Sequence, residues 1–122
     1  MSAPTLASLA ADLAAGRTTS RQLVEDCLAR IADPKGEGQR VYIHVDKDAA
    51  LAAADAMDAL RKANAAPSRF AGIPVSIKDL FDIKGQVTRA GSRALDAHGK
   101  SLSSALLDLE IDDTFGDTDR AP

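Results

Sequence analysis

The sequence predicts an α/β fold, on three observations. Two amphipathic helical stretches follow one another in residues 5–32, and a long alanine-rich stretch covers residues 47–64. Two short runs rich in β-branched residues, 41–45 and 73–77, have the composition and length of strands. We therefore expect an N-terminal helical hairpin, an alanine-rich helix and two short strands.

The hairpin is bounded by capping residues. Thr5 opens a helix that places apolar residues on one face, and Gly16 is a natural stop. Thr19 and Gln22 have the capping-box spacing, in which each side chain bonds the backbone of the other residue. The second helix ends near Asp33-Pro34, because proline cannot continue it. The expected apolar faces are Leu6, Leu9, Ala10 and Leu13 in the first helix, and Leu23, Val24, Cys27, Leu28 and Ile31 in the second.

The next elements are a polar loop at residues 33–40, a strand at Val41–Val45 and a helix that Asp46 caps. This helix runs to about Asn64 and buries Leu51, Ala54, Met57 or Asp58, and Leu60. Its alanines favour close packing. Ile73–Ile77 then reads as an apolar strand, with Pro74 near its start. Further on, we expect loop conformations at Gly85 and Gly91, a helical turn at Ser92–Asp96, a weak helix at Ser101–Leu109 and a frayed end at Asp112–Pro122.

The composition is that of an ordinary globular domain, with 122 residues, 45% hydrophobic and 27% charged. Aromatic residues make up only 3%, so any core is thin. The net charge of −3 gives no basis for a nucleic-acid partner, and no apolar run is long enough to span a membrane. Cys27 is the only cysteine and reads as a small buried hydrophobe. The N-terminal residues do not have the pattern of a signal peptide, and the chain is expected to be cytoplasmic.

Lys78 directly follows the predicted Ile73–Ile77 strand. A lysine withdrawn from water can lose its proton and act as a base, and Asp79 and Asp82 lie close enough in sequence to pair with it instead. The simpler interpretation is a strand-end lysine that points into solvent, which is common. The residues alone favour the simpler interpretation.

The motif G-I-P-V-S-I-K-D at residues 72–79, followed by T-R-A-G-S at 88–92, resembles the lysine-bearing motif of the amidase-signature family. The resemblance covers about residues 5–95, and it extends to the order of hairpin, strand and alanine-rich helix. It implies a mixed-sheet α/β domain and a Ser–cis-Ser–Lys triad that hydrolyses a small-molecule amide through an acyl-enzyme. Only the lysine carries over, as Lys78. No cofactor and no metal is implied.

The resemblance also implies that both catalytic serines lie beyond this chain, which is then a truncated fragment, inactive alone. Ser101, Ser103 and Ser104 lack the flanking glycines that the family's serines have. We expect residues 1–95 to be the amidase part and residues 96–122 a divergent, poorly ordered acidic tail. That tail has seven acidic and two basic residues. A frameshift or premature end would account for it.

Two alternatives remain open. The chain could be a small helical protein-interaction module in which Lys78 is incidental. Within the enzymes, it could be the A subunit of a tRNA-dependent amidotransferase, although Leu80-Phe81 after Lys78-Asp79 favours a general amidase. The unpaired Ile73–Ile77 strand would also invite self-association. His44 and His98 lie too far apart in sequence for a metal site, and the acidic residues after Asp108 lack the glycine and glutamate of a calcium loop.

Overall fold

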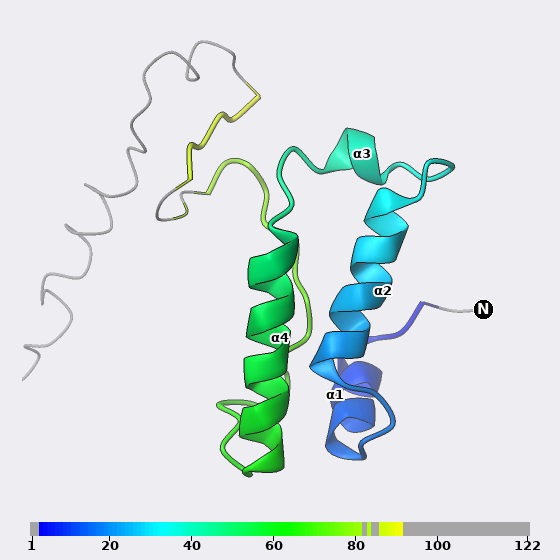
Figure 1. The fold of residues 1–122 in the computed structure, drawn as a ribbon, viewed down its shortest axis with the longest axis vertical. Coiled ribbons are helices and arrows are strands. Elements are labelled where there is room, and N and C mark those ends of the chain that lie inside the picture. Colours follow the sequence, from blue (N-terminus) through cyan, green and yellow to red (C-terminus); the bar gives the residue numbers. More distant parts are fainter. Residues whose placement is uncertain (1–2, 82, 84–85, 92–122) are drawn as a thin grey trace, which may run out of the picture. The chain divides into compact units, whose positions relative to one another are not determined.

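The computed structural model of the chain describes residues 3–81, 83 and 86–91, which form parts of two compact units, Met1–Val75 and Ser76–Pro122. The first unit contains four helices, α1 (Leu6–Ala14), α2 (Ser20–Ala32), α3 (Gly38–Val41) and α4 (Lys47–Lys62), as Figure 1 shows. The described residues of the second unit form turns and extended chain. Gly85 and the elements predicted after residue 91 lie outside the described residues.

The boundaries of α1 are set by local hydrogen bonds, as predicted. At its start, the Ser8 N–H donates to Thr5 Oγ1 (3.1 Å) and the Thr5 N–H donates to Ser8 Oγ (2.9 Å), which completes a capping box. At its end, Gly16 has φ +67°. The Arg17 N–H donates to the Asp12 carbonyl at 2.9 Å, so the helix closes in a Schellman motif that requires this left-handed residue.

Helix α2 confirms both predicted ends but only half of the predicted capping box. Thr19 Oγ1 accepts from the Gln22 N–H at 3.1 Å. The Gln22 side chain does not return to Thr19; it donates to Asp26 Oδ1 one turn further on, at 3.0 Å. The helix stops at Asp33, the residue before the proline.

Helix α4 begins and ends as the sequence indicates. Asp46 Oδ1 accepts from the Ala49 N–H at 3.0 Å and caps the first turn. Asn64 takes the left-handed conformation, with φ +54°, just past the last turn. The Ala65 N–H donates to the Leu60 carbonyl at 2.8 Å, which makes a second Schellman motif with asparagine in place of glycine.

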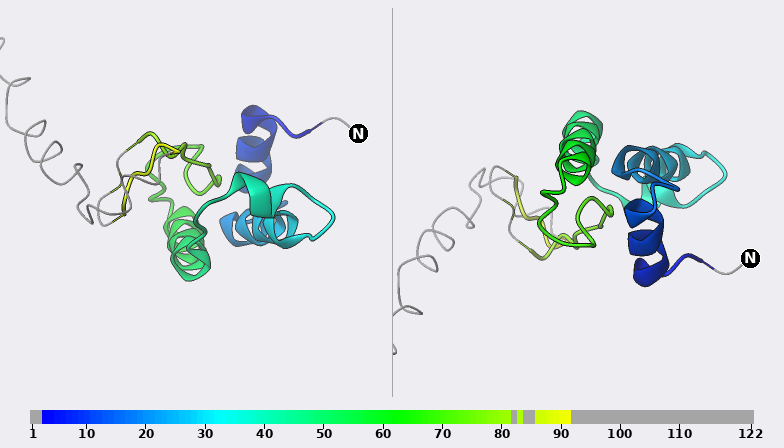
Figure 2. Two further views of the ribbon diagram at one scale, coloured as in Figure 1. Left: turned by 90° about the horizontal axis from the view of Figure 1, so that it is seen from above. Right: turned by 90° about the horizontal axis from the view of Figure 1, so that it is seen from below.

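Helices α2 and α4 lie side by side and run in opposite directions, and α1 lies beside the first turns of α2 (Figure 2). The buried apolar residues are small or few: Ala10, Leu13, Val24 and Ala54. Leu51 and Met57 are half-buried, and Leu60 is exposed, as is Leu6 on α1. The predicted apolar faces are therefore confirmed except at Leu6 and Leu60, and the thin core expected from the composition is present. None of the described helices is long and apolar enough to cross a membrane.

The predicted strand Val41–Val45 is wrong. Gly38–Val41 instead forms the single turn α3, which also shortens the predicted loop, and the chain then runs to Asp46 without pairing. Gly38 packs so closely on α2 that a Cβ there would lie 2.2 Å from the Ile31 carbonyl oxygen. A β-branched run becomes a strand only when a neighbouring strand takes up its backbone hydrogen bonds, and the described residues supply none.

The predicted strand Ile73–Ile77 is also absent for the same reason. Its residues are extended but unpaired, and Val75 and Ile77 are 79% and 58% exposed. The described part of the chain is therefore helical without strands, which corrects the expected α/β class over these residues.

Candidate functional site

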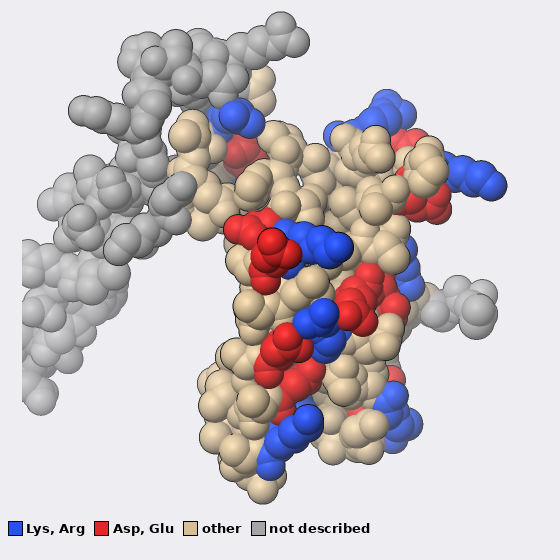
Figure 3. All heavy atoms as spheres, in the orientation of Figure 1, with Lys and Arg blue, Asp and Glu red and all other residues tan. Residues whose placement is uncertain are grey.

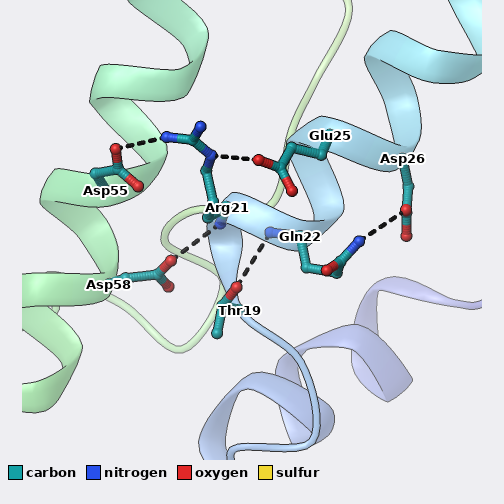
Figure 4. A network of polar contacts seen from close by, with 7 residues as sticks. All are labelled: Thr19, Arg21, Gln22, Glu25, Asp26, Asp55 and Asp58. Atoms are coloured by element: carbon teal, nitrogen blue, oxygen red, sulfur yellow. Dashed lines mark hydrogen bonds and ion pairs between the residues drawn. The ribbon is translucent and has the colours of Figure 1, made fainter.

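The start of α2 is held by a side chain from α4. Asp58 accepts two backbone hydrogen bonds, from the Ser20 N–H (2.8 Å) to Oδ1 and from the Arg21 N–H (3.0 Å) to Oδ2. Figure 4 shows this carboxylate facing the first turn of α2. Those N–H groups have no partner within the helix, and the positive end of the helix dipole lies there, so a carboxylate is well suited to the position.

The same contacts determine the protonation of Asp58. Partial burial alone would raise its pKa, but the backbone N–H groups of Arg21 and Ser20 donate to the charged form and outweigh burial. The pKa of Asp58 consequently lies below the ordinary aspartate value. Asp58 is therefore ionised at neutral pH and acts as a structural tie between α2 and α4.

An exposed ion-pair network crosses the same two helices. Arg21 Nε lies 2.6 Å from Glu25 Oε1, and Arg21 Nη1 lies 2.7 Å from Asp55 Oδ2. The hydrogen bond to Glu25 is the largest cause that raises the pKa of Arg21. Figure 3 shows acidic and basic side chains interleaved over this face. Because these side chains are 40–57% exposed, the network contributes little to stability.

The glycine of the lysine-bearing motif is fixed against the first turn of α2. Gly72 has φ +85°, and a Cβ there would lie 1.9 Å from Ser20 Oγ, so the position accepts only glycine. Ser20 is fully buried beneath it. The Arg61 side chain of α4 donates to the Ala71 carbonyl and holds the turn from the other side. Ala71 and Gly72 thus lie against both α2 and α4.

Lys78 stands at a tight turn in the second unit. Its carbonyl oxygen accepts from the Leu80 N–H (2.7 Å) and the Phe81 N–H (3.1 Å), and its side chain is exposed. Two contacts tie this turn to a segment seven to ten residues later. Asp79 Oδ1 accepts from the Arg89 N–H at 3.2 Å, and Thr88 Oγ1 donates to the Phe81 carbonyl at a long 3.4 Å.

The other predicted site residues are dispersed. Cys27 is half-buried on α2 and His44 is exposed in the segment before α4. His98, the three serines at 101, 103 and 104, and the acidic residues after Asp108 lie outside the described residues. Over the described ranges, no three His, Cys, Asp or Glu side chains come together in a way that could hold a metal ion.

Sequence reasoning missed several residues that shape the site. The sequence pattern offers Asp58 only as an alternative buried residue of its helix, and its role in capping α2 depends on a contact 38 residues away in sequence. Ser20 gives no signal beyond its place after a cap. Gly72 belongs to the motif, but the motif alone does not reveal the close approach that requires a glycine there.

Comparison with known proteins identifies one family. A sequence model of the Amidase family matches residues 22–108, which extends past the boundary predicted after residue 95. The division at 95 itself stays a prediction. No solved structure gives a significant match.

Several curated relatives carry one name, that of the A subunit of glutamyl-tRNA(Gln) amidotransferase. The protein from Myxococcus xanthus is 45% identical over 94 residues, which is 75% of this chain and 19% of the relative. Those from Renibacterium salmoninarum and Chloroflexus aggregans are 43% and 46% identical over 74% and 68% of this chain, and 17% of each relative is covered. The chain therefore spans about a fifth of the length of these relatives. The match of the family model over most of the sequence means that this chain belongs to the amidase family.

Proposed function

We propose that this chain supplies the lysine of an amidase-family active site, and that Lys78 is the base in the hydrolysis of a carboxylic amide. In the family's mechanism, the lysine accepts a proton through a bridging serine while a second serine attacks the amide carbonyl. The single observation that carries the proposal is Lys78 at the exposed head of a tied turn, within the family's matched region.

The proposal needs groups that the described residues do not provide. A base must be uncharged at the moment it accepts a proton, and a lysine loses its charge most readily where it is withdrawn from water. No serine among the described residues contacts the Lys78 side chain. We therefore place the covering surface and the nucleophile outside residues 3–91, and we expect the 122-residue chain alone to show no turnover.

Within the family, the relatives favour the A subunit of the amidotransferase over a general amidase. The three relatives are 43–46% identical, and each is named as the A subunit of glutamyl-tRNA(Gln) amidotransferase. We propose the same branch for this chain, against the preference for a general amidase drawn from Leu80-Phe81. The net charge of −3 gives this segment no electrostatic reason to contact the RNA.

A hybrid protein tests the role of Lys78. The aligned region of the Myxococcus xanthus relative is replaced with this chain's sequence, and ammonia release from a carboxamide such as glutamine is measured. Lys78→Met should lower the rate by about 10²-fold or more, because a positioned general base contributes at least that much. Lys35→Met, an exposed lysine in the loop after α2, is the matched control and should keep full activity. A Lys78→Met hybrid as active as the control would refute the proposal.

We also propose that the isolated chain self-associates through the extended segment around Val75 and Ile77. Both side chains are exposed, and the backbone of residues 73–77 makes no strand pairing within the described residues. The Ile73 N–H donates to the Phe70 carbonyl and Pro74 has no N–H, so the edge that a second copy could pair with is at residues 75–77. Replacing Val75 with lysine should shift the chain toward monomer in sedimentation, while Val41→Lys, a control at a valine that is 65% exposed, should not. A monodisperse wild-type monomer would contradict the idea.

A further inference from the structure

The burial pattern around Lys78 is the reverse of what hydrophobic packing alone produces. From Val75 to Phe81, every residue is exposed except Asp79, which is half-buried. Ile77, Leu80 and Phe81 are 58%, 56% and 66% exposed. Burying a carboxylate is costly unless a partner compensates for the lost water. A specific contact must therefore hold Asp79 in place.

That contact is the hydrogen bond from the Arg89 N–H to Asp79 Oδ1, at 3.2 Å. It joins the residue after Lys78 to a point ten residues later in the chain. The second carboxylate oxygen, Oδ2, is also buried and has no hydrogen-bond partner among the described residues. An oxygen left without a partner costs free energy, so the position of Asp79 is not explained by the stability of the turn alone.

The far end of the contact lies at a strained backbone. Ala90 has φ +48° and Gly91 has φ +74°, so two left-handed residues follow Arg89 directly. The left-handed conformation is unfavourable for alanine, and residues held this way gather at functional sites. The Arg89 N–H that bonds Asp79 therefore lies next to a residue, Ala90, that other contacts must hold in the left-handed conformation.

From these observations, we propose that Asp79 is a positioning residue for Lys78. Its carboxylate clamps the turn that carries Lys78 to the Arg89–Gly91 segment, and this fixes the point from which the lysine side chain extends. The inference rests on the proposed role of Lys78 as a base. A base one ångström out of place loses much of its effect, so the clamp governs the rate of proton transfer rather than substrate affinity.

Backbone NMR of the full 122-residue chain tests the clamp directly. In Asp79→Ala, the Arg89 amide should exchange about five- to tenfold faster, which is the effect of losing one hydrogen bond. The Lys78 amide should become less ordered. Asp79→Asn keeps an acceptor oxygen and should restore both values to near wild type. Asp48→Ala, which removes an exposed carboxylate from the first turn of α4, is the control and should change neither.

Each alternative outcome decides against the clamp. Unchanged Arg89 exchange in Asp79→Ala would overturn it, and so would an Asp79→Asn variant that behaves like alanine. A loss of α-helical circular dichroism in Asp79→Ala would mean that Asp79 supports the fold in general, which also overturns it.

The hybrid enzyme supplies the catalytic test. There, Asp79→Ala should lower kcat about tenfold with KM unchanged, and Asp79→Asn should recover most of the loss. The exchange result does not depend on hydrolysis. If the exchange changes as expected but Lys78→Met remains active, the clamp stands and the proposed function falls.

Discussion

Each of the two compact units of this chain is ordered by different interactions. In the first, helices α1, α2 and α4 each begin at a side-chain cap, and α1 and α4 close in Schellman motifs. In the second, the described residues around Lys78 have no helix, their apolar side chains are exposed, and two side-chain contacts join the ends of the loop. The helix ends of the first unit are specified locally, whereas the loop around Lys78 depends on a few polar contacts.

The difference separates residues that stabilise the fold from residues that serve the proposed activity. Functional groups often lie on loops that a more stable scaffold carries, because the scaffold supplies order that the loop does not make for itself. Here the Gly72 turn, packed on Ser20 and held by Arg61, is the last part of the first unit before the lysine-bearing segment. Substitutions in the first unit should therefore change stability, while substitutions around Lys78 should change activity.

The largest expected loss of stability is at Gly72. Gly72→Ala combines a left-handed backbone with a Cβ placed 1.9 Å from Ser20 Oγ, so we expect the free energy of unfolding to fall by about 2–4 kcal/mol. Gly16→Ala is the matched control, because Gly16 has φ +67° but no atom within 4 Å of the added Cβ. It should cost only about 1–2 kcal/mol.

Adding Ser20→Ala to Gly72→Ala should recover part of the loss, because the clashing oxygen is removed. Thermal unfolding followed by helical circular dichroism measures all four proteins. Equal losses in Gly72→Ala and Gly16→Ala would mean that the close approach to Ser20 does not constrain the fold.

A smaller loss is expected at Asp58. Asp58→Ala removes the acceptor of two N–H groups at the start of α2, and this should cost about 1–2 kcal/mol of stability. Asp26→Ala, which removes an exposed carboxylate that accepts a hydrogen bond from Gln22, is the control and should cost much less. Chemical denaturation gives both values. An Asp58→Ala loss no greater than that of the control would contradict the capping role.

The same residue makes stability depend on pH. The pKa of Asp58 is lower in the folded chain than the ordinary value of 3.8, so its contribution is present in full above that value. It is lost as the pH falls below 3.8 and through the folded pKa. Asp58→Asn should therefore flatten the fall in melting temperature over this acid range. An unchanged acid profile in Asp58→Asn would assign the dependence to other carboxylates.

The smallest effect is expected for the exposed ion pairs. Arg21 contacts Glu25 and Asp55 at short distances, but all three side chains are at least 40% exposed. Solvent screening and the entropy of fixing long side chains cancel most of the attraction. A double-mutant cycle of Arg21→Ala and Asp55→Ala should give a coupling close to experimental error, and smaller still in high salt. A large coupling that persists in salt would show that the network holds α2 to α4.

The local elements of the first unit could be predicted from the sequence, because their signals are local. Thr5, Asp46 and Pro34 mark helix ends through their own side chains, and the structure places the ends there. The two strands could not be predicted correctly, because β-branched composition at 41–45 and 73–77 does not reveal whether a partner strand is available. The contacts of Asp58, Gly72 and Asp79 link residues 10 to 52 positions apart, and no local pattern encodes them.

The Amidase match confirms the family resemblance drawn from the motif at residues 72–92. The role of Lys78 as a base stays a prediction, because its side chain is exposed among the described residues.

The most direct test of Lys78 as the base is chemical rescue of Lys78→Ala in the hybrid enzyme. Carboxylate formation from the amide substrate is measured with and without an added small primary amine. We predict that the variant loses activity by about 10²-fold or more and regains part of it, in proportion to the amine, because the amine takes the place of the missing base. Full activity of Lys78→Ala without any added amine would contradict the central claim that Lys78 is the base.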